Sequence, residues 1–135
     1  MILITEVLAN LINDSELAVY SPNDADGDIY IETMPDVEKE YLVSIYQYGG
    51  RRRELSSFGD TRHYSIQINV KNRIKNNALK KLTKIIDAIN FKEYTYENYY
   101  LFDITATQEP YILKVDKDGK YIASVNITVS CNINN

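Results

Sequence analysis

Two short acidic segments that contain glycine are the first places where this sequence could bind a metal ion. They are Asp24-Ala25-Asp26-Gly27-Asp28 and Asp116-Lys117-Asp118-Gly119, and both resemble part of a calcium-binding loop. An EF-hand loop needs carboxylates at its first and twelfth positions, with glycine at the sixth. Counted from its glycine, the first segment has Pro22 and Thr33 at those positions, and the second has Val125 at the twelfth. We therefore interpret both segments as turns and expect no metal and no other cofactor.

The single histidine and the single cysteine offer little catalytic chemistry. His63 begins an alternating segment without an acidic partner next to it, and a general base needs a partner within hydrogen-bond reach. Cys131 lies on the apolar side of another alternating segment, where a buried and inert thiol is the usual state. Gly49-Gly50 alone is a weak sign of a phosphate-binding loop. We predict that the protein is not an enzyme; a catalytic or ligand site assembled only in three dimensions stays open as an alternative.

Charge is distributed unevenly along the chain, although the net charge is only −4. Residues 1–50 hold ten acidic residues and one basic residue, whereas residues 51–84 hold ten basic and two acidic residues. Residues 85–135 hold seven acidic and four basic residues. A chain with one acidic and one basic region can attract copies of itself or can present the basic region to a polyanion. A solvated helix face is the plain alternative for the basic region.

Hydrophobic periodicity indicates the elements that position these residues. Apolar residues recur at helical spacing over residues 2–12 and 73–89, with Asn72 as the expected N-cap of the second helix. Segments rich in β-branched and aromatic residues, or alternating in polarity, predict strands. These strands are expected over residues 17–20, 28–32, 41–48, 63–71, 99–105, 111–115 and 120–133. Glycines, three consecutive arginines and serines predict a long exposed loop over Gly49–Arg62.

The order of these elements predicts an α+β fold in one domain, residues 1–135. We expect a largely antiparallel or mixed β-sheet with two amphipathic helices packed on one face, and a long loop after the third strand. The apolar N-terminal residues lack the basic lead and the cleavage site of a signal peptide, and polar residues interrupt them. We therefore expect no membrane partner and a protein that is made, or assembled, in a cytosol.

A strand ending in Tyr46-Gln47-Tyr48-Gly49-Gly50 is followed by the expected loop and then by Tyr64-Ser65-Ile66-Gln67-Ile68-Asn69-Val70-Lys71, which leads into the lysine-rich helix. This order resembles the bacteriophage tail terminator family, also called minor capsid or tail completion proteins. Members have an N-terminal helix, a strand with a Gly-Gly turn, a strand of the form Ile-Gln-Ile-x-Val-Lys/Arg and a following helix. The resemblance covers the whole chain in order and length.

The resemblance implies a structural virion protein that forms a homohexameric ring at the head-proximal end of the tail. Its partners would be other copies of itself, the tail tube protein and the head–tail connector protein, with assembly in the host cytoplasm. Two patches of opposite charge suit the heterologous contacts of a ring. The residues that we expect at the contact with a neighbouring subunit or the tube are Gly49, Gly50, Arg51, Arg52, Arg53, Glu54, Arg62, Asp24, Asp26 and Asp28. The alternative is a small nucleic-acid-binding module that uses the basic 51–84 region, although specific recognition of nucleic acid is not expected because the sequence has no known DNA-binding motif.

Overall fold

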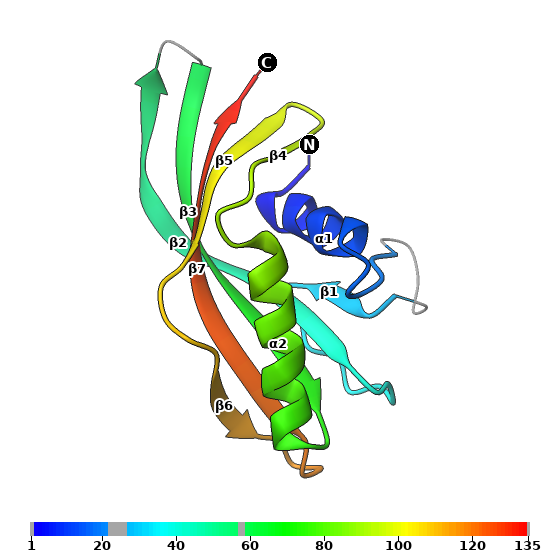
Figure 1. Cartoon of the computed structure of the whole chain (residues 1–135). Coiled ribbons are helices and arrows are strands. Elements are labelled where there is room, and N and C mark those ends of the chain that lie inside the picture. Colours follow the sequence, from blue (N-terminus) through cyan, green and yellow to red (C-terminus); the bar gives the residue numbers. More distant parts are fainter. Residues whose placement is uncertain (1, 22–26, 57–58, 135) are drawn as a thin grey trace.

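A computed structural model of the chain describes residues 2–21, 27–56 and 59–134, with the backbone alone for residues 50–56 and 59 (Figure 1). The two helices are α1 (Ile4–Asp14) and α2 (Lys75–Ile89). The first strands along the chain are β1 (Ile29–Ile31), β2 (Leu42–Ser56) and β3 (Gly59–Asn72). The strands after α2 are β4 (Tyr94–Tyr96), β5 (Tyr99–Ala106), β6 (Tyr111–Val115) and β7 (Tyr121–Ile133).

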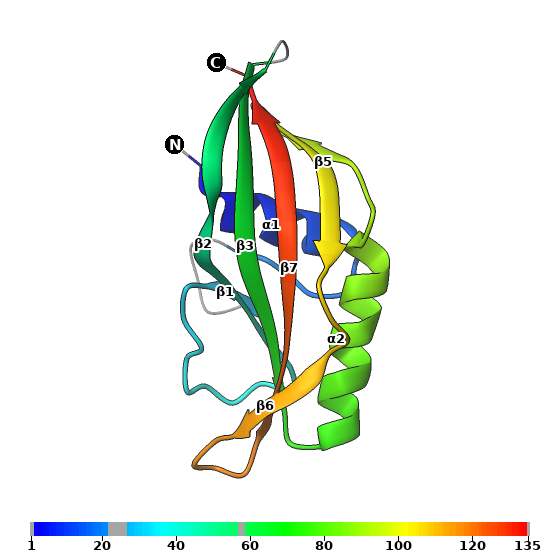
Figure 2. The same cartoon turned by 90° about the vertical axis from the view of Figure 1, so that its left-hand side faces the viewer.

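These strands form one mixed sheet in the order β1-β2-β3-β7-β5-β4, with β6 also paired to β7. β1 runs parallel to β2, and the other described pairs are antiparallel. The sheet curls, and in Figures 1 and 2 the two helices lie on its concave side. The predicted α+β class, with a mixed sheet and two helices, is therefore confirmed.

Strict alternation in the central strands makes the concave face of the sheet apolar. In the register of β3 and β7, Ile66 lies opposite Ile127 and Ile68 lies opposite Val125, and all four side chains are buried. Successive side chains of a strand point to opposite faces, so the residues between them form the other face. The concave row packs against the apolar side of each helix, including Leu8 of α1. The core therefore lies between the sheet and the helices.

The start of α2 differs from the sequence prediction, which made Asn72 the N-cap. The N-cap position is Ile74, and the helix begins at Lys75. Asn72 ends β3, where its Oδ1 accepts a hydrogen bond from the backbone N–H of Ile74 at 2.8 Å. Its side-chain amide donates to the carbonyl oxygen of Glu40 at 2.7 Å. Asn72 thus fixes the turn into the helix, a role that asparagine side chains often play in turns.

The long exposed loop predicted over Gly49–Arg62 is wrong, because most of this segment is strand. β2 runs on to Ser56 and β3 begins at Gly59, so the segment extends the β2–β3 hairpin. The register shifts twice, between Gln47 and Gly50 and again between Arg51 and Glu54. Gly49 has φ +129°, which favours glycine. Composition suggested a loop, but the backbone pairs with β3 and the two shifts absorb the irregular residues.

Two further strand predictions need correction. The segment 17–20 is not a strand; there the carbonyl oxygen of Val19 accepts hydrogen bonds from the N–H groups of Asp28 and Ile29, at 2.7 and 3.2 Å. The structure also contains β4, a strand that was not predicted from the sequence. Both segments are only three or four residues long, and so short a stretch carries too little periodicity to separate a strand from a turn.

Candidate interaction surface

The outer edge of β2 is the first feature that could bind another chain. β1 pairs only with Val43–Ile45, so within the described residues no strand covers the outer edge of β2 beyond Ile45. One backbone group there is satisfied locally, because the N–H of Gln47 donates to Oε1 of Glu32 at 2.8 Å. An uncovered strand edge offers backbone donors and acceptors to a neighbouring strand. The edge that carries Gly49, Gly50 and Arg51–Glu54 is therefore suited to sheet extension.

Arg62, another residue expected at the interface, contacts groups within its own chain. Its Nη2 and Nε lie 2.9 and 3.1 Å from Oδ2 of Asp60, and its side chain is about one-quarter exposed. Its pKa is raised, first by a hydrogen bond with Tyr64 and then by the hydrogen bond with Asp60. In the register of β3 and β7, Arg62 lies opposite the buried Cys131. Arg62 therefore contributes to the packing at this end of the sheet.

The acidic residues expected at the interface are only partly within the described structure. Asp24 and Asp26 lie outside the described residues. Asp28 immediately precedes β1, where its Oδ1 lies 3.9 Å from Nζ of Lys39 and its Oδ2 accepts a weak hydrogen bond from the N–H of Val19 at 3.4 Å. None of the described contacts joins Asp28 to Arg62, so the structure does not bring these two residues together.

Uncharged polar side chains form a row along the convex face of β3 and β7. Figure 2 shows these two strands from their convex side. Thr61 donates to Oδ1 of Asn132 at 2.6 Å, directly across the two strands. Further along, Gln67 donates to Oδ1 of Asn126 at 3.3 Å and accepts from Asn69 at 3.3 Å. Cross-strand pairs of this kind hold register and leave a hydrogen-bonding surface. The alternation of β3 and β7 indicated this polar face in the sequence, but not its pairing.

The same face brings a serine, a histidine and an aspartate into one row, which invites comparison with a hydrolase triad. His63 Nδ1 lies 2.7 Å from Oγ of Ser130, and Asp103 of β5 lies opposite Ser130 on the other side. In a catalytic triad the histidine stands between the nucleophile and the carboxylate. Here the serine stands in the middle, and the hydroxyl of Thr105 donates to Asp103 at 2.6 Å. The row is therefore a polar sheet surface and not a triad.

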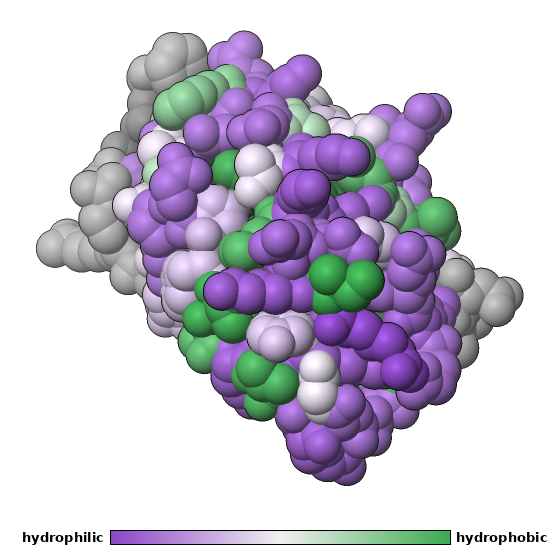
Figure 3. Space-filling view, turned by 60° about the horizontal axis from the view of Figure 1, so that its bottom comes forward, coloured by the Kyte–Doolittle hydropathy of each residue, from purple (hydrophilic) through white to green (hydrophobic). Residues whose placement is uncertain are grey.

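Ion pairs join the β6–β7 turn to β3 and to the loop before β2. Nζ of Lys71, which is only 6% exposed, lies 2.7 Å from Oδ2 of Asp116. Glu38 accepts from Arg73 at 3.1 Å and from Lys120 at 3.4 Å. Figure 3 views this end of the molecule, and hydrophilic residues cover most of it, with small separate hydrophobic patches. Lys71 and Arg73 of the basic region are thus paired with acidic residues of the same chain.

The Lys71–Asp116 pair predicts a pH dependence of stability. The hydrogen bond from Lys71, assisted by the N–H groups of Lys120 and Asp118, lowers the pKa of Asp116 to about 2. An unfolded aspartate has a pKa of about 3.9. Because the folded pKa is the lower one, this carboxylate stabilises the fold above about pH 4, and its contribution is lost as the pH falls toward 2.

We expect Asp116→Asn to lower the urea midpoint at neutral pH. The difference from the unsubstituted protein should shrink between about pH 4 and pH 2, as the native carboxylate protonates. Urea unfolding of both proteins at several pH values measures this difference. Asp118→Asn is the matched control, because its side chain forms no described ion pair. A difference that stays constant with pH would refute the role of the Asp116 charge.

The remaining lysines of the basic region lie on α2. Lys80 and Lys84 are exposed, and Lys81 lies with its Nζ 5.3 Å from the centre of the Tyr41 ring. Together with Asn77 and Leu17, these four residues line a shallow cavity of about 350 Å³. This groove, which we call the lysine groove, follows the flank of α2 that faces the start of β2.

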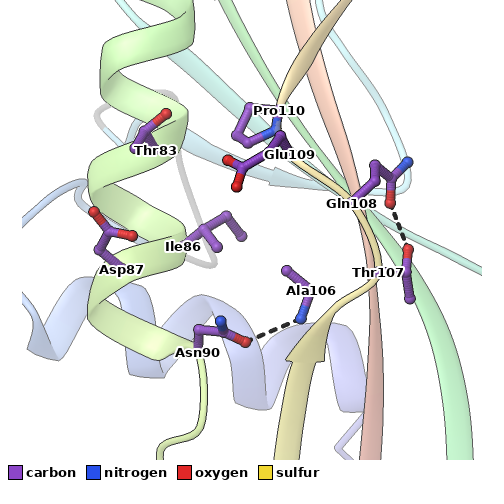
Figure 4. Close-up of a pocket in the computed structure, with 9 residues that line it drawn as sticks. All are labelled: Thr83, Ile86, Asp87, Asn90, Ala106, Thr107, Gln108, Glu109 and Pro110. Atoms are coloured by element: carbon purple, nitrogen blue, oxygen red, sulfur yellow. Dashed lines mark hydrogen bonds between the residues drawn. The ribbon is translucent and has the colours of Figure 1, made fainter.

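A second cavity, of about 320 Å³, lies on the other flank of α2, against the segment that joins β5 to β6 (Figure 4). In Figure 4 the Glu109 carboxylate and the Ile86 side chain point into the space between helix and segment. Asp87, the next residue of the helix, also borders the cavity, but its side chain points to the outer side of α2. Gln108 and Thr107 point to the far side. Asn90 holds the segment in place by accepting a hydrogen bond from the N–H of Ala106 at 2.9 Å. We call this cavity the acidic groove; no motif or periodicity in the sequence indicated it.

Other kinds of site find little support in the described residues. No group of three or more potential metal-ligating side chains occurs among them. In the second predicted turn, Asp116 Oδ1 accepts from the N–H groups of Asp118 and Lys120. Residues 24–26 of the first predicted turn lie outside the described residues. Cys131 is buried, and burial raises the pKa of its thiol to about 11. No described helix is long and apolar enough to cross a membrane.

Comparison with known proteins first identifies the class of fold. A chain from the virion of a native gene transfer agent particle has a similar structure, with a TM-score of 0.59 at 13% identity. The alignment covers 93% of the present chain and 84% of that chain. The α+β fold described above is therefore one that also occurs in a virion particle. A search of curated proteins found no match.

The family itself is identified by sequence. A family model described as "Bacteriophage tail terminator protein" matches residues 11–133, which is nearly the whole chain. The chain therefore belongs to the bacteriophage tail terminator protein family, and it is a phage structural protein of the virion rather than an enzyme. This confirms the resemblance drawn from the strand, Gly-Gly and helix order of the sequence.

Proposed function

We propose that copies of this chain form a homohexameric ring that caps the tail tube when the tube has reached its full length. The ring would then join the tube to the head–tail connector, at the head-proximal end of the tail, after assembly in the host cytoplasm. The observation that carries this proposal is the family match over residues 11–133. Tail termination requires binding and no catalysis, because a cap stops polymerisation by covering the surface to which the next tube subunit would bind.

The geometry supports contact between identical subunits in two ways. β2 has an uncovered edge beyond Ile45, and a neighbouring strand can add to such an edge through backbone hydrogen bonds. The chain also carries opposite charges on separate segments, and a heterologous contact needs two different patches that match. Within this proposal, the segment Gly49–Glu54 of β2 contacts the neighbouring subunit or the tube.

Nucleic-acid binding by the basic region is the weaker alternative. Binding to phosphates requires several cations that converge and are free to exchange their counterions. In the described structure Lys71 and Arg73 are engaged by Asp116 and Glu38, and Lys81 lies against an aromatic ring. These contacts leave fewer cations for phosphate than the sequence suggests.

The capping function is tested with a growing tail tube. Purified protein is added to tail tube protein that is polymerising from its initiator, and tube lengths are measured by electron microscopy. We expect tubes that stop growing and carry density at one end. Tubes that keep elongating at the same rate in the presence of excess protein would contradict the proposal. A salt-sensitive affinity for duplex DNA, without any effect on tubes, would favour the alternative.

A further inference from the structure

We propose that the exposed ridge of α2 is a subunit interface, in which Lys80 and Lys84 of one copy enter the acidic groove of the next copy. This inference rests on the proposed ring and names the surfaces that close it. The two grooves lie on opposite flanks of the same exposed helix ridge. A contact between the lysine flank of one copy and the acidic flank of the next joins different patches, so it propagates from subunit to subunit.

Several charged side chains on this ridge form no ion pair with the described residues. Lys80, Lys84, Asp87 and Glu109 are all exposed, and none of them forms an ion pair within the described part of the chain. By contrast, the cations at the lower end of the sheet are held by Asp116 and Glu38. Opposite charges without an ion pair among the described residues can pair with a second copy, and complementarity of this kind steers association and fixes its register.

The lining of the acidic groove suits a lysine side chain. Its polar rim includes the two carboxylates, and its walls include Ile86, Ala106 and Pro110. A lysine buries its hydrocarbon stem against apolar surface while its ammonium group stays with polar partners. Asn90 and Ala106 join the helix to the opposite wall through their hydrogen bond, so the groove is already shaped before a neighbour binds. The occupant that this chemistry fits is the lysine ridge of a second copy.

A charge-swap series tests the interface. We expect Lys80→Glu/Lys84→Glu and Asp87→Lys/Glu109→Lys each to weaken self-association about tenfold or more, because each places like charges together. The quadruple variant, which exchanges the signs, should regain most of the association. Lys75→Glu/Lys92→Glu and Glu16→Lys/Glu97→Lys are matched controls at exposed positions outside both grooves. Sedimentation velocity at low salt measures the association, and circular dichroism checks that each variant is folded.

Cysteine cross-linking gives an independent readout that does not depend on weakening the assembly. Lys84→Cys protein mixed with Glu109→Cys protein should form a mixed disulfide under mild oxidation, and rings should persist. Preferential linkage of Lys84→Cys to itself would overturn the heterologous contact. If rings form but neither the charge swap nor the mixed disulfide has an effect, the α2 interface is wrong while the proposed ring stands. If the acidic reversal alone weakens assembly and the lysine reversal does not, a different segment occupies the groove and the assignment is again wrong.

If the unsubstituted protein forms no ring, alone or with the tube, and the Lys84→Cys and Glu109→Cys proteins give no mixed disulfide, both the ring and the interface are refuted. These outcomes separate a failure of the interface from a failure of the ring.

Discussion

Reversing the three consecutive arginines of β2, as Arg51→Glu/Arg52→Glu/Arg53→Glu, is expected to reduce ring formation by about a hundredfold or more. These residues lie in sequence on the strand whose edge is uncovered beyond Ile45. Like charges placed across an interface cost several kcal/mol, and each 1.4 kcal/mol is about tenfold in affinity. The strand pairing with β3 is a backbone interaction, so the monomer should remain folded.

The matched control changes the same number of charges elsewhere. Lys75→Glu/Lys92→Glu/Lys114→Glu alters three exposed lysines and shifts the net charge equally. The fraction of protein in rings is counted by electron microscopy and confirmed by native mass spectrometry. If the arginine variant forms rings and caps tubes as well as the control does, then the 51–53 segment is not at the interface.

The second large effect concerns the helix that carries both grooves. Leu82 is fully buried on the core side of α2, within the cluster that joins the helix to the sheet. Removing a buried leucine side chain costs the lost transfer free energy and leaves a cavity, so Leu82→Ala should lower the free energy of unfolding by about 2–5 kcal/mol. Urea unfolding at neutral pH measures this change in the free energy of unfolding.

Thr83→Ala is the matched control one residue further along the helix. Thr83 is exposed, and its hydroxyl donates to the carbonyl oxygen of Leu79 within the helix. Exposed substitutions of this kind usually change stability by less than about 0.5 kcal/mol. A Leu82→Ala effect as small as that of the control would mean that α2 is not anchored through this side chain, and the helix could not position the grooves as described.

Much of the fold was predictable because long periodic segments carry a strong signal. The alternation of β3 and β7 and the apolar arc of α2 set both the element types and the buried faces. β2 beyond Tyr48 was not predictable in the same way. There Gly49, Gly50 and three arginines have loop composition, yet the segment is held in the sheet by pairing with β3, its neighbour in the hairpin. Composition alone does not indicate this pairing, because strand preference depends strongly on the cross-strand neighbours.

The candidate site was less accessible to sequence reasoning than the fold. The sequence indicated an acidic segment and a basic segment, but not which charges pair within the subunit. Arg62 and Asp28 both form ion pairs inside it. The acidic groove joins Asp87 of α2 to Glu109, which follows β5, and two residues separated in this way meet only after the sheet has formed. The resemblance to the family was drawn from the order of elements along the whole chain, and the family match over residues 11–133 confirms it although single segments were predicted wrongly.

Native mass spectrometry of the purified protein over a range of concentrations, with and without tail tube protein, should decide whether identical copies close into a ring, and the same samples are imaged. Copies that join through two different patches should produce a closed six-membered species, and imaging should show it as a ring on the tube end. A protein that stays monomeric throughout, or that forms only twofold dimers, would contradict the account.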